Sequence, residues 1–129
     1  MKNVILIGMP GAGKSTVGVV LAKRLGYTFL DSDLVIQQKY GRLLHELISE
    51  HGVEGFWKIE NDVNAGLTCD RTVIATGGSA IYGKEAMEHL QEIGTVIYLE
   101  VAYPEHRVSL MAVTEEEELK IIKRKPRTT

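Results

Sequence analysis

Four residues near the start of the chain have the types and the spacing of a phosphate-binding loop. The segment GMPGAGKST fits the pattern G-x-x-x-x-G-K-[ST] at Gly8, Gly13, Lys14 and Ser15. Glycines allow backbone N–H groups to turn toward a phosphate, and a helix that begins here adds the partial positive charge of its N-terminus. In this pattern the lysine reaches the terminal phosphates of a nucleotide, and the serine hydroxyl can ligate Mg²⁺. The alternative is a Gly-rich turn that holds no ligand.

Two acids follow a short apolar segment, where they could act on a bound nucleotide. Asp31 and Asp33 lie in the segment LDSDL. If a strand continues through them, alternation points both side chains to the same side. Asp31 would then orient metal-bound water, and Asp33 would accept the proton of an attacking hydroxyl. Because Asp is a favoured N-cap, the alternative is that one of them, more readily Asp33, only caps the next helix.

A pair of glycines follows a third apolar segment. The sequence TGGS occupies residues 76–79, directly after TVIA. Gly77 and Gly78 allow close backbone approach, and their N–H groups could meet the oxygens of an acceptor or of the transferred phosphate. The alternative is a plain turn.

The apolar pattern predicts the elements that would bring these three segments together. Continuous apolar runs predict strands at 4–7, 28–31, 72–76 and 95–101. Helical spacing of apolar residues predicts helices over 14–25, 34–40, 43–50, 53–67 and 83–92. This alternation predicts an α/β fold with a mostly parallel sheet of about four strands, and in such a sheet the loops that follow the strands share one edge.

The composition is that of an ordinary globular domain. The chain has 129 residues, 44% of them hydrophobic and 25% charged, with a net charge of −2. So weak a charge argues against a nucleic-acid or anionic-membrane partner. No stretch approaches the roughly 20 apolar residues that a membrane span needs. Cys69 is the only cysteine, which excludes an internal disulfide and favours a reducing, cytoplasmic setting.

The order and spacing of these segments resemble the shikimate kinase family. The matching stretches are GMPGAGKSTVG, FLDSD, F-x-x-I-E at residues 56–60 and IATGGSAI, within about residues 2–105. The phosphate loop alone is shared by many NTPases, whereas D-S-D and T-G-G at these distances are far more selective. The resemblance implies a three-layer P-loop kinase fold over residues 1–112, which leaves 113–129 as a charged tail or short helix.

Carried over to the matching positions, the resemblance implies phosphoryl transfer from ATP to a hydroxyl of a small metabolite, shikimate, in aromatic amino-acid biosynthesis. ATP would be held by the loop residues Gly11, Ala12, Gly13, Lys14, Ser15 and Thr16. Ser15 and Asp31 would bind Mg²⁺. Lys14 and Asp33 would be the catalytic residues, with Asp33 as the base. The acceptor would contact Asp33, Trp57, Gly77, Gly78 and Ser79, the last of which stands where the family usually has a third glycine.

Trp57 departs from the family motif F-R-x-x-E, in which the arginine binds the carboxylate of the acceptor. An apolar ring with one N–H replaces a planar fork of donors. Trp57 is expected on the helix face of Glu60 and Asn61, either at the acceptor pocket or packed against a neighbouring helix. Lys58 lies about 100° round the helix and is not expected to substitute for the arginine. This leaves open a different hydroxylated acceptor, such as gluconate or a nucleoside monophosphate.

The resemblance fades after the segment VIYLEVAYPE. The family's arginine-bearing lid and fifth strand are not expected here, and Arg107, Arg124 and Arg127 sit in no lid pattern. Because a transition-state arginine can contribute about 10³ to 10⁵ in rate, the alternative function is a nucleotide-binding homologue with weak or no catalysis. Without a fifth strand, the fourth is expected to be an exposed edge through which a homodimer could form.

Overall fold

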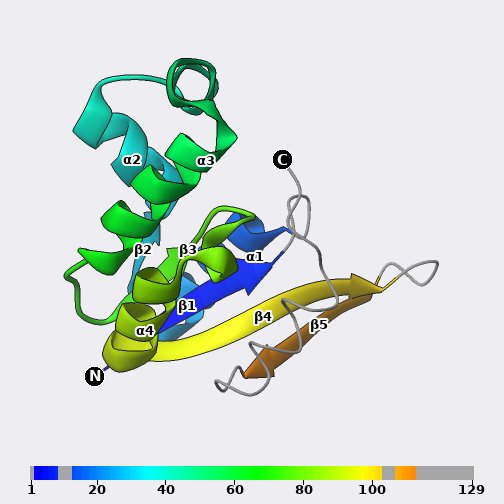
Figure 1. Ribbon diagram of the computed structural model, residues 1–129. Helices are drawn as coiled ribbons and strands as arrows, with labels where there is room; N and C mark the ends of the chain where they lie inside the picture. Colours follow the sequence, from blue (N-terminus) through cyan, green and yellow to red (C-terminus); the bar gives the residue numbers. More distant parts are fainter. Residues whose placement is uncertain (1, 9–12, 103–106, 113–129) are drawn as a thin grey trace.

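The computed structural model describes residues 2–8, 13–102 and 107–112 (Figure 1). The strands are β1 (Asn3–Gly8), β2 (Thr28–Asp31), β3 (Thr72–Ala75), β4 (Gly94–Ala102) and β5 (Arg107–Ala112). The helices are α1 (Lys14–Leu25), α2 (Ser32–Tyr40), α3 (Leu44–Ala65) and α4 (Lys84–Ile93), with a short 3₁₀ helix η1 (Ala80–Tyr82). The tail expected at 113–129 lies outside the described residues, so the proposed domain boundary stays a prediction.

The strands form one sheet in the order β2-β3-β1-β4-β5. The first four are parallel: Val4 of β1 lies opposite Val73 of β3 and Thr95 of β4, and Asp31 of β2 lies opposite Ala75 of β3. The predicted α/β fold with a mostly parallel sheet is therefore confirmed. Because parallel strands point the same way, the loops after β1, β2 and β3 leave the sheet at one edge.

The prediction that the fourth strand is an exposed edge is wrong. β5 pairs antiparallel with β4 over the whole of its length, from Ala102↔Arg107 to Ile97↔Ala112, and Figure 1 shows the two strands side by side. β4 is thus hydrogen-bonded to β1 on one side and to β5 on the other. The sequence analysis missed β5 because six residues beside a highly charged segment give only a short apolar signal. Because β5 covers the edge of β4, the exposed edge on which the predicted homodimer depended is not present.

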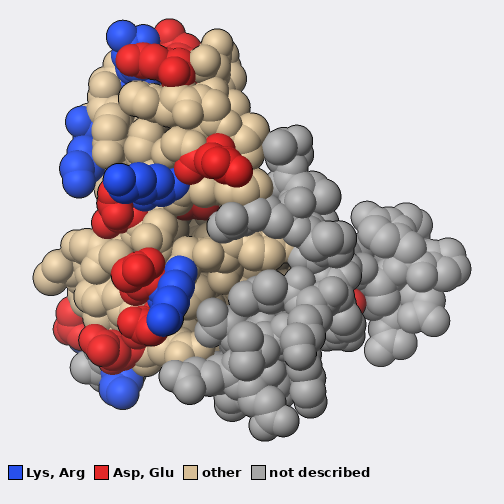
Figure 2. Space-filling model, viewed as in Figure 1, with Lys and Arg blue, Asp and Glu red and all other residues tan. Residues whose placement is uncertain are grey.

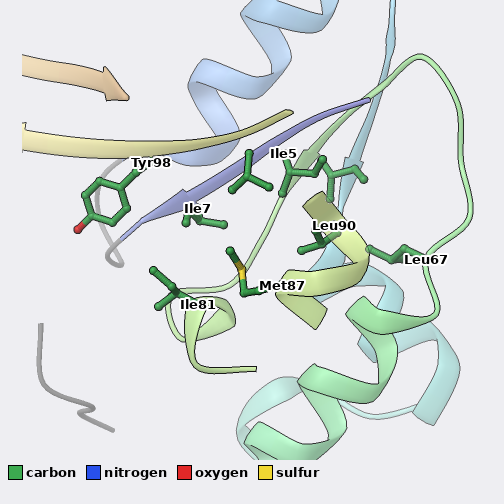
Figure 3. Close-up of a cluster of buried hydrophobic side chains, with 9 residues drawn as sticks. Ile5, Ile7, Leu67, Ile81, Met87, Leu90 and Tyr98 are labelled. Atoms are coloured by element: carbon green, nitrogen blue, oxygen red, sulfur yellow. The ribbon is translucent and has the colours of Figure 1, made fainter. Parts of the chain in front are cut away.

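Alternation along β1 divides the core between the two faces of the sheet. Ile5 and Ile7 are fully buried on one face, where Met87 and Leu90 of α4 pack against them (Figure 3). Leu6 points to the other face, in a cluster to which α1 contributes. Each fully buried side chain of this size contributes roughly 1.5–3 kcal/mol, so these two contacts hold α1 and α4 on opposite faces of the sheet. The result is the expected three-layer arrangement.

A break in α3 separates the two helices that the sequence predicts over 43–50 and 53–67. The α-helical span is continuous except at Gly52, whose φ of 75° and ψ of 172° are not helical. A residue with a Cβ rarely adopts this conformation, which explains the glycine. Phe56 and Ile59, on the second half of the span, pack with Ile36 of α2 and Leu47 of the first half.

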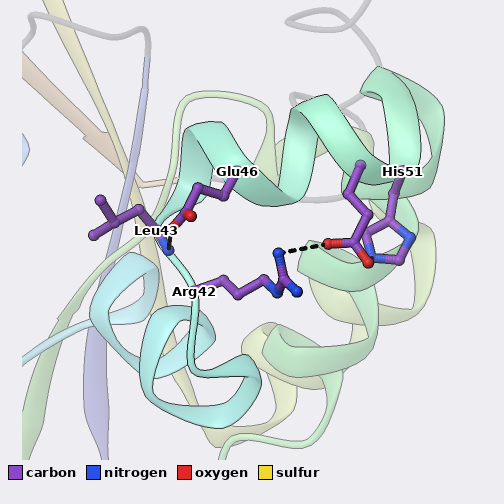
Figure 4. A network of polar contacts seen from close by, with 5 residues as sticks. Arg42, Leu43, Glu46 and His51 are labelled. Carbon is purple, nitrogen blue, oxygen red and sulfur yellow. Dashed lines mark hydrogen bonds and ion pairs between the residues drawn. The ribbon is translucent and has the colours of Figure 1, made fainter.

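Polar contacts fix the start of α3. The Glu46 carboxylate accepts a hydrogen bond from the backbone N–H of Leu43 at 2.9 Å, and Arg42 forms an ion pair with Glu50 at 3.0 Å (Figure 4). The ion pair is half exposed, so it contributes about 0–1 kcal/mol. The Glu46 contact satisfies a backbone donor that the helix itself leaves without a partner.

The described surface carries both signs of charge. On the face in Figure 2, basic and acidic side chains lie close to one another over the part of the chain that the structure describes. Such mixing produces local rather than long-range fields. None of the helices built from the described residues combines the length and the apolar character needed to cross a membrane.

Candidate active site

The start of α1 positions the Lys14 side chain against the end of β1. Gly8 has a φ of 151°, and a Cβ there would lie 2.5 Å from the carbonyl oxygen of Leu99, its partner on β4, so the close approach of β1 and β4 at this point requires glycine. The Nζ of Lys14 donates a hydrogen bond to the Gly8 carbonyl oxygen at 2.7 Å. Gly11 and Ala12, which the sequence analysis assigns to the nucleotide site, lie outside the described residues.

A cavity of about 430 Å³ opens at the edge of the sheet where the loops emerge. This volume lies within the usual range for small-molecule sites. Residues of the phosphate-loop segment, of the segment with the two acids and of the TGGS segment all line it. They are Gly13, Lys14, Ser15, Thr16, Asp31, Asp33, Thr76, Gly77 and Gly78. Three segments that are far apart in the sequence thus meet around one space, as the predicted topology requires.

Asp31, not Asp33, caps α2. One oxygen of Asp31 accepts a hydrogen bond from the backbone N–H of Asp33 at 2.9 Å, and the other lies 3.4 Å from the hydroxyl oxygen of Ser15. The alternative that Asp33 is the cap is therefore wrong. The strand ends at Asp31, so Asp33 reaches the cavity from the first turn of α2 and not through strand alternation.

Burial shifts the pKa values of Asp33 and Lys14 in opposite directions. The pKa of Asp33 is raised above its ordinary value, chiefly by burial and further by the neighbouring Asp31 charge, while Lys14 acts in the opposite sense. The pKa of Lys14 is lowered, again chiefly by burial, although Asp33, Glu60 and Asp31 all favour its charged form. A carboxylate that is more basic than usual therefore lies close to an ammonium, an arrangement suited to proton transfer beside an anion.

Gly77 lies between two carboxylates. A Cβ at this position would be 2.5 Å from Oε2 of Glu60 and 2.9 Å from Oδ1 of Asp33, so a methyl group there would force the carboxylates or the turn to move. Glu60 is buried, with 3% of its surface exposed, and its Oε1 accepts a hydrogen bond from the Ser79 hydroxyl at 2.8 Å.

Two residues of this site were not assigned to it by the sequence analysis. Glu60 appeared there only as part of a motif and as a neighbour of Trp57 on its helix face. Thr76, which lines the cavity, donates both its N–H and its hydroxyl to the Leu6 carbonyl oxygen, at 3.1 and 2.8 Å. A polar residue directly after an apolar strand was the available signal for Thr76.

A second cavity, of about 480 Å³, contains Trp57. The lining residues come from α3 and from the segment after β3: Glu54, Trp57, Lys58, Asn61, Ser79, Tyr82, Gly83, Lys84 and Glu85. Trp57 also packs against the buried cluster between α2 and α3, so the packing interpretation is confirmed, whereas its contact with the acceptor stays a prediction. Lys58 lines the same cavity, and the expectation that it does not substitute for the family's arginine stays a prediction. Ser79 connects this cavity with Gly77 and Gly78 of the first.

Comparison with known proteins decides the family. The family profile described as "Shikimate kinase" matches residues 10–124, which is most of the chain. The chain belongs to the shikimate kinase family. The match continues beyond residue 105, where the sequence analysis expected the resemblance to fade.

Individual relatives agree with this assignment. A shikimate kinase of Nostoc sp. is 46% identical over 101 residues, which cover 77% of this chain and 55% of that protein. A shikimate kinase of Francisella tularensis subsp. novicida is also 46% identical over 101 residues, covering 77% of this chain and 57% of that protein. The chain therefore spans little more than half the length of these curated relatives.

Solved structures show the same fold. The shikimate kinase of Acinetobacter baumannii, in complex with shikimate, superposes with a TM-score of 0.73 at 36% identity, covering 96% of this chain and 63% of that one. The shikimate kinase of Aquifex aeolicus superposes with a TM-score of 0.72 at 26% identity, covering 96% and 83%.

Proposed function

We propose that this protein transfers the terminal phosphoryl group of ATP to a hydroxyl of shikimate. One observation carries the proposal: Lys14 at the start of α1, Asp33 in the first turn of α2 and Gly77 after β3 line one cavity at the edge of a P-loop kinase sheet. Membership of the shikimate kinase family and the likeness to a structure that contains shikimate support the choice of acceptor. We place this activity in the cytoplasm, as the single cysteine suggests.

The residues around the first cavity fit a nucleotide with Mg²⁺. Lys14 and the N-terminus of α1 supply positive charge for phosphates, and Gly77 adds no side chain to the wall of the cavity. Ser15 and Asp31 bring a hydroxyl and a carboxylate within 3.4 Å of each other, and oxygen ligands of this kind suit Mg²⁺. Bound there, the ion would neutralise charge on the phosphate oxygens.

The proposed mechanism assigns one step to each group of the chain. Asp33 accepts the proton of the acceptor hydroxyl while the acceptor oxygen bonds to the γ-phosphorus and the bond to the leaving ADP breaks. Lys14 stabilises the negative charge that the phosphate carries during transfer. The N–H groups of Gly77 and Gly78 orient the acceptor and the transferred group. Trp57 and Ser79, in the second cavity, contact the remainder of the acceptor.

The experiment measures binding and turnover separately. ATP with Mg²⁺ is titrated into the purified chain by calorimetry, and shikimate-dependent ADP release is followed beside direct detection of phosphorylated shikimate. We expect binding, turnover and the phosphorylated product, and loss of turnover in Lys14→Ala. Binding without any turnover would favour the alternative, a nucleotide-binding homologue with weak or no catalysis.

Trp57 supports a second candidate function. Because its ring, and not a guanidinium, lines the second cavity, the acceptor could be a hydroxylated metabolite without the carboxylate of shikimate. Gluconate and nucleoside monophosphates belong in the same assay. Faster turnover of one of these than of shikimate would transfer the assignment to that acceptor.

A further inference from the structure

The turn at residues 76–79 is held at both ends by side-chain hydrogen bonds. At its start, the hydroxyl of Thr76 is bonded to the carbonyl oxygen of Leu6 in β1. At its end, the hydroxyl of Ser79 is bonded to Glu60 of α3 at 2.8 Å. Gly77 and Gly78, which line the first cavity, lie between these two fixed points.

The Glu60 carboxylate uses both of its oxygens on this turn. Oε1 accepts the hydrogen bond from Ser79, and Oε2 lies against Gly77, on the side that also faces Asp33. The same carboxylate is close enough to Lys14 to favour its ammonium form. Glu60 is therefore a buried charge, 3% exposed, that contacts the turn and faces the proposed catalytic groups.

We propose that Glu60 is a positioning residue for acceptor binding, which acts through the Ser79 hydroxyl on the turn at 76–79. This inference rests on the proposed function, because that turn is assigned to the acceptor there. A glycine at position 79 would offer no hydroxyl, so the serine in this chain supplies the contact through which Glu60 fixes the turn. A hydrogen bond to a buried carboxylate is short and charge-assisted, and it is costly to remove.

A purely structural role for Glu60 predicts a different pattern of effects. A buried carboxylate that only stabilised α3 would lower the melting temperature when altered, and ATP and acceptor binding would weaken together. A positioning role acts on one substrate. In Ser79→Ala, which leaves the Glu60 carboxylate beside Lys14, the KM for the acceptor should rise while the Kd for ATP stays the same.

The test uses the variants Ser79→Ala and Glu60→Gln and their combination. Ser79→Ala removes the hydroxyl, whereas Glu60→Gln keeps an oxygen that can accept from it and removes the charge. We expect Ser79→Ala to raise the acceptor KM by about tenfold, the effect of one charge-assisted hydrogen bond, and Glu60→Gln to raise it less. Because both changes act on one contact, the double variant should show much less than the product of the single effects.

Two surface substitutions serve as matched controls. Ser49→Ala on α3 and Glu88→Gln on α4 make the same chemical changes at exposed positions. Both should leave the acceptor KM within about twofold of the wild type. Fully multiplicative effects of Ser79→Ala and Glu60→Gln, or equal losses in ATP and acceptor binding, would overturn the proposal.

A further measurement separates this inference from the proposed function. If the wild type phosphorylates none of the acceptors, the proposed function fails. The contact itself is still tested by hydrogen exchange at the Gly77 and Gly78 amides. We expect about tenfold faster exchange in Ser79→Ala than in Ser49→Ala, from the loss of one anchoring hydrogen bond. Equal exchange rates in the two variants would show that Glu60 does not hold the turn.

Discussion

The carboxylate of Asp31 accepts a hydrogen bond from the backbone N–H of Asp33 at 2.9 Å, so the first acid fixes the helical turn that carries the second. The other oxygen of Asp31 remains directed toward the Ser15 hydroxyl. One residue thus has two roles, a cap for α2 and a proposed ligand for Mg²⁺. Two substitutions separate these roles.

The cap and the metal role of Asp31 should respond differently to Asp31→Asn and Asp31→Ala. Asparagine caps a helix about as well as aspartate, so Asp31→Asn should change the free energy of unfolding by less than about 0.5 kcal/mol, whereas Asp31→Ala should lower it by about 1 kcal/mol. Both should raise the Mg²⁺ concentration needed for half-maximal turnover. Thermal unfolding and Mg²⁺ titration of the rate measure the two effects. An unchanged Mg²⁺ requirement in both variants would remove Asp31 from the metal site.

Gly77→Ala should lower turnover strongly and also destabilise the fold. The new methyl group would meet two carboxylate oxygens at 2.5 and 2.9 Å, so either the turn or the acids must move. Overpacking of this kind costs about 1–3 kcal/mol, and we expect turnover to fall by at least about 100-fold because misplaced reacting groups lose rate steeply. Gly66→Ala is the control, since its nearest contact would be an ordinary 3.5 Å. Steady-state kinetics and melting temperatures of both variants decide the matter.

The raised pKa of Asp33 predicts opposite effects on rate and on stability. As a base, Asp33 must be ionised, so turnover should rise with pH through its raised pKa, at higher pH than for an ordinary aspartate. At alkaline pH, the lowered pKa of Lys14 should end the plateau below the usual lysine range. The product is a bell-shaped pH profile.

The stability of the fold should respond in the opposite sense. Between pH 3.8 and the raised pKa, the folded protein holds a proton on Asp33 that the unfolded chain has already released. The free energy of unfolding should therefore fall as pH rises from the ordinary aspartate value of 3.8 to the raised pKa. Asp33→Asn removes this slope and should be at least as stable as the wild type at pH 7, while turnover drops by about 10² to 10⁴. Denaturant titrations at several pH values provide the measurement. A less stable variant at pH 7 would show that the Asp33 carboxylate contributes net stability.

Trp57→Arg should improve the use of shikimate. A guanidinium at this position could pair with the carboxylate of the acceptor, and such a bond contributes about 1.5–3 kcal/mol, which corresponds to roughly a 10- to 100-fold lower KM. The melting temperature should fall by a few degrees, since the Trp57 ring packs against the cluster between α2 and α3. Lys58→Arg adds the same group one position along and should have little effect. No improvement in Trp57→Arg would contradict our account of this position.

The sequence predicts well the features that depend on local apolar patterns. The four parallel strands, the helix after the phosphate loop and the break near Gly52 all follow from short runs whose signals agree with the final packing. The convergence of Lys14, Asp31 and Gly77 follows in turn from the direction of parallel strands. No knowledge of side-chain contacts is needed for these steps.

Contacts between distant segments could not be predicted in the same way. Asn3 illustrates the limit, because its side chain bonds the carbonyl oxygens of Cys69 and Ile93 and the N–H of Thr72, which lie far along the chain. The position of Lys58 in the same cavity as Trp57 also depends on where the opposite wall of the cavity lies. Such contacts are set by the packed tertiary structure, and a single sequence carries no local signal for them.

The hydrogen bond from Lys14 to the Gly8 carbonyl oxygen has a consequence for how a nucleotide would arrive. The ammonium group has already exchanged water for a protein oxygen during folding, and its four-carbon stem is already directed toward the end of β1. An incoming phosphate oxygen would therefore replace the Gly8 carbonyl oxygen as the hydrogen-bond partner of Lys14. Binding would not have to remove a full shell of water from the ammonium group or to restrict a freely rotating side chain. Because the Gly8 carbonyl is neutral, its hydrogen bond to Lys14 is weaker than a bond to an anion. The lysine can therefore transfer rapidly from the carbonyl oxygen to a phosphate oxygen.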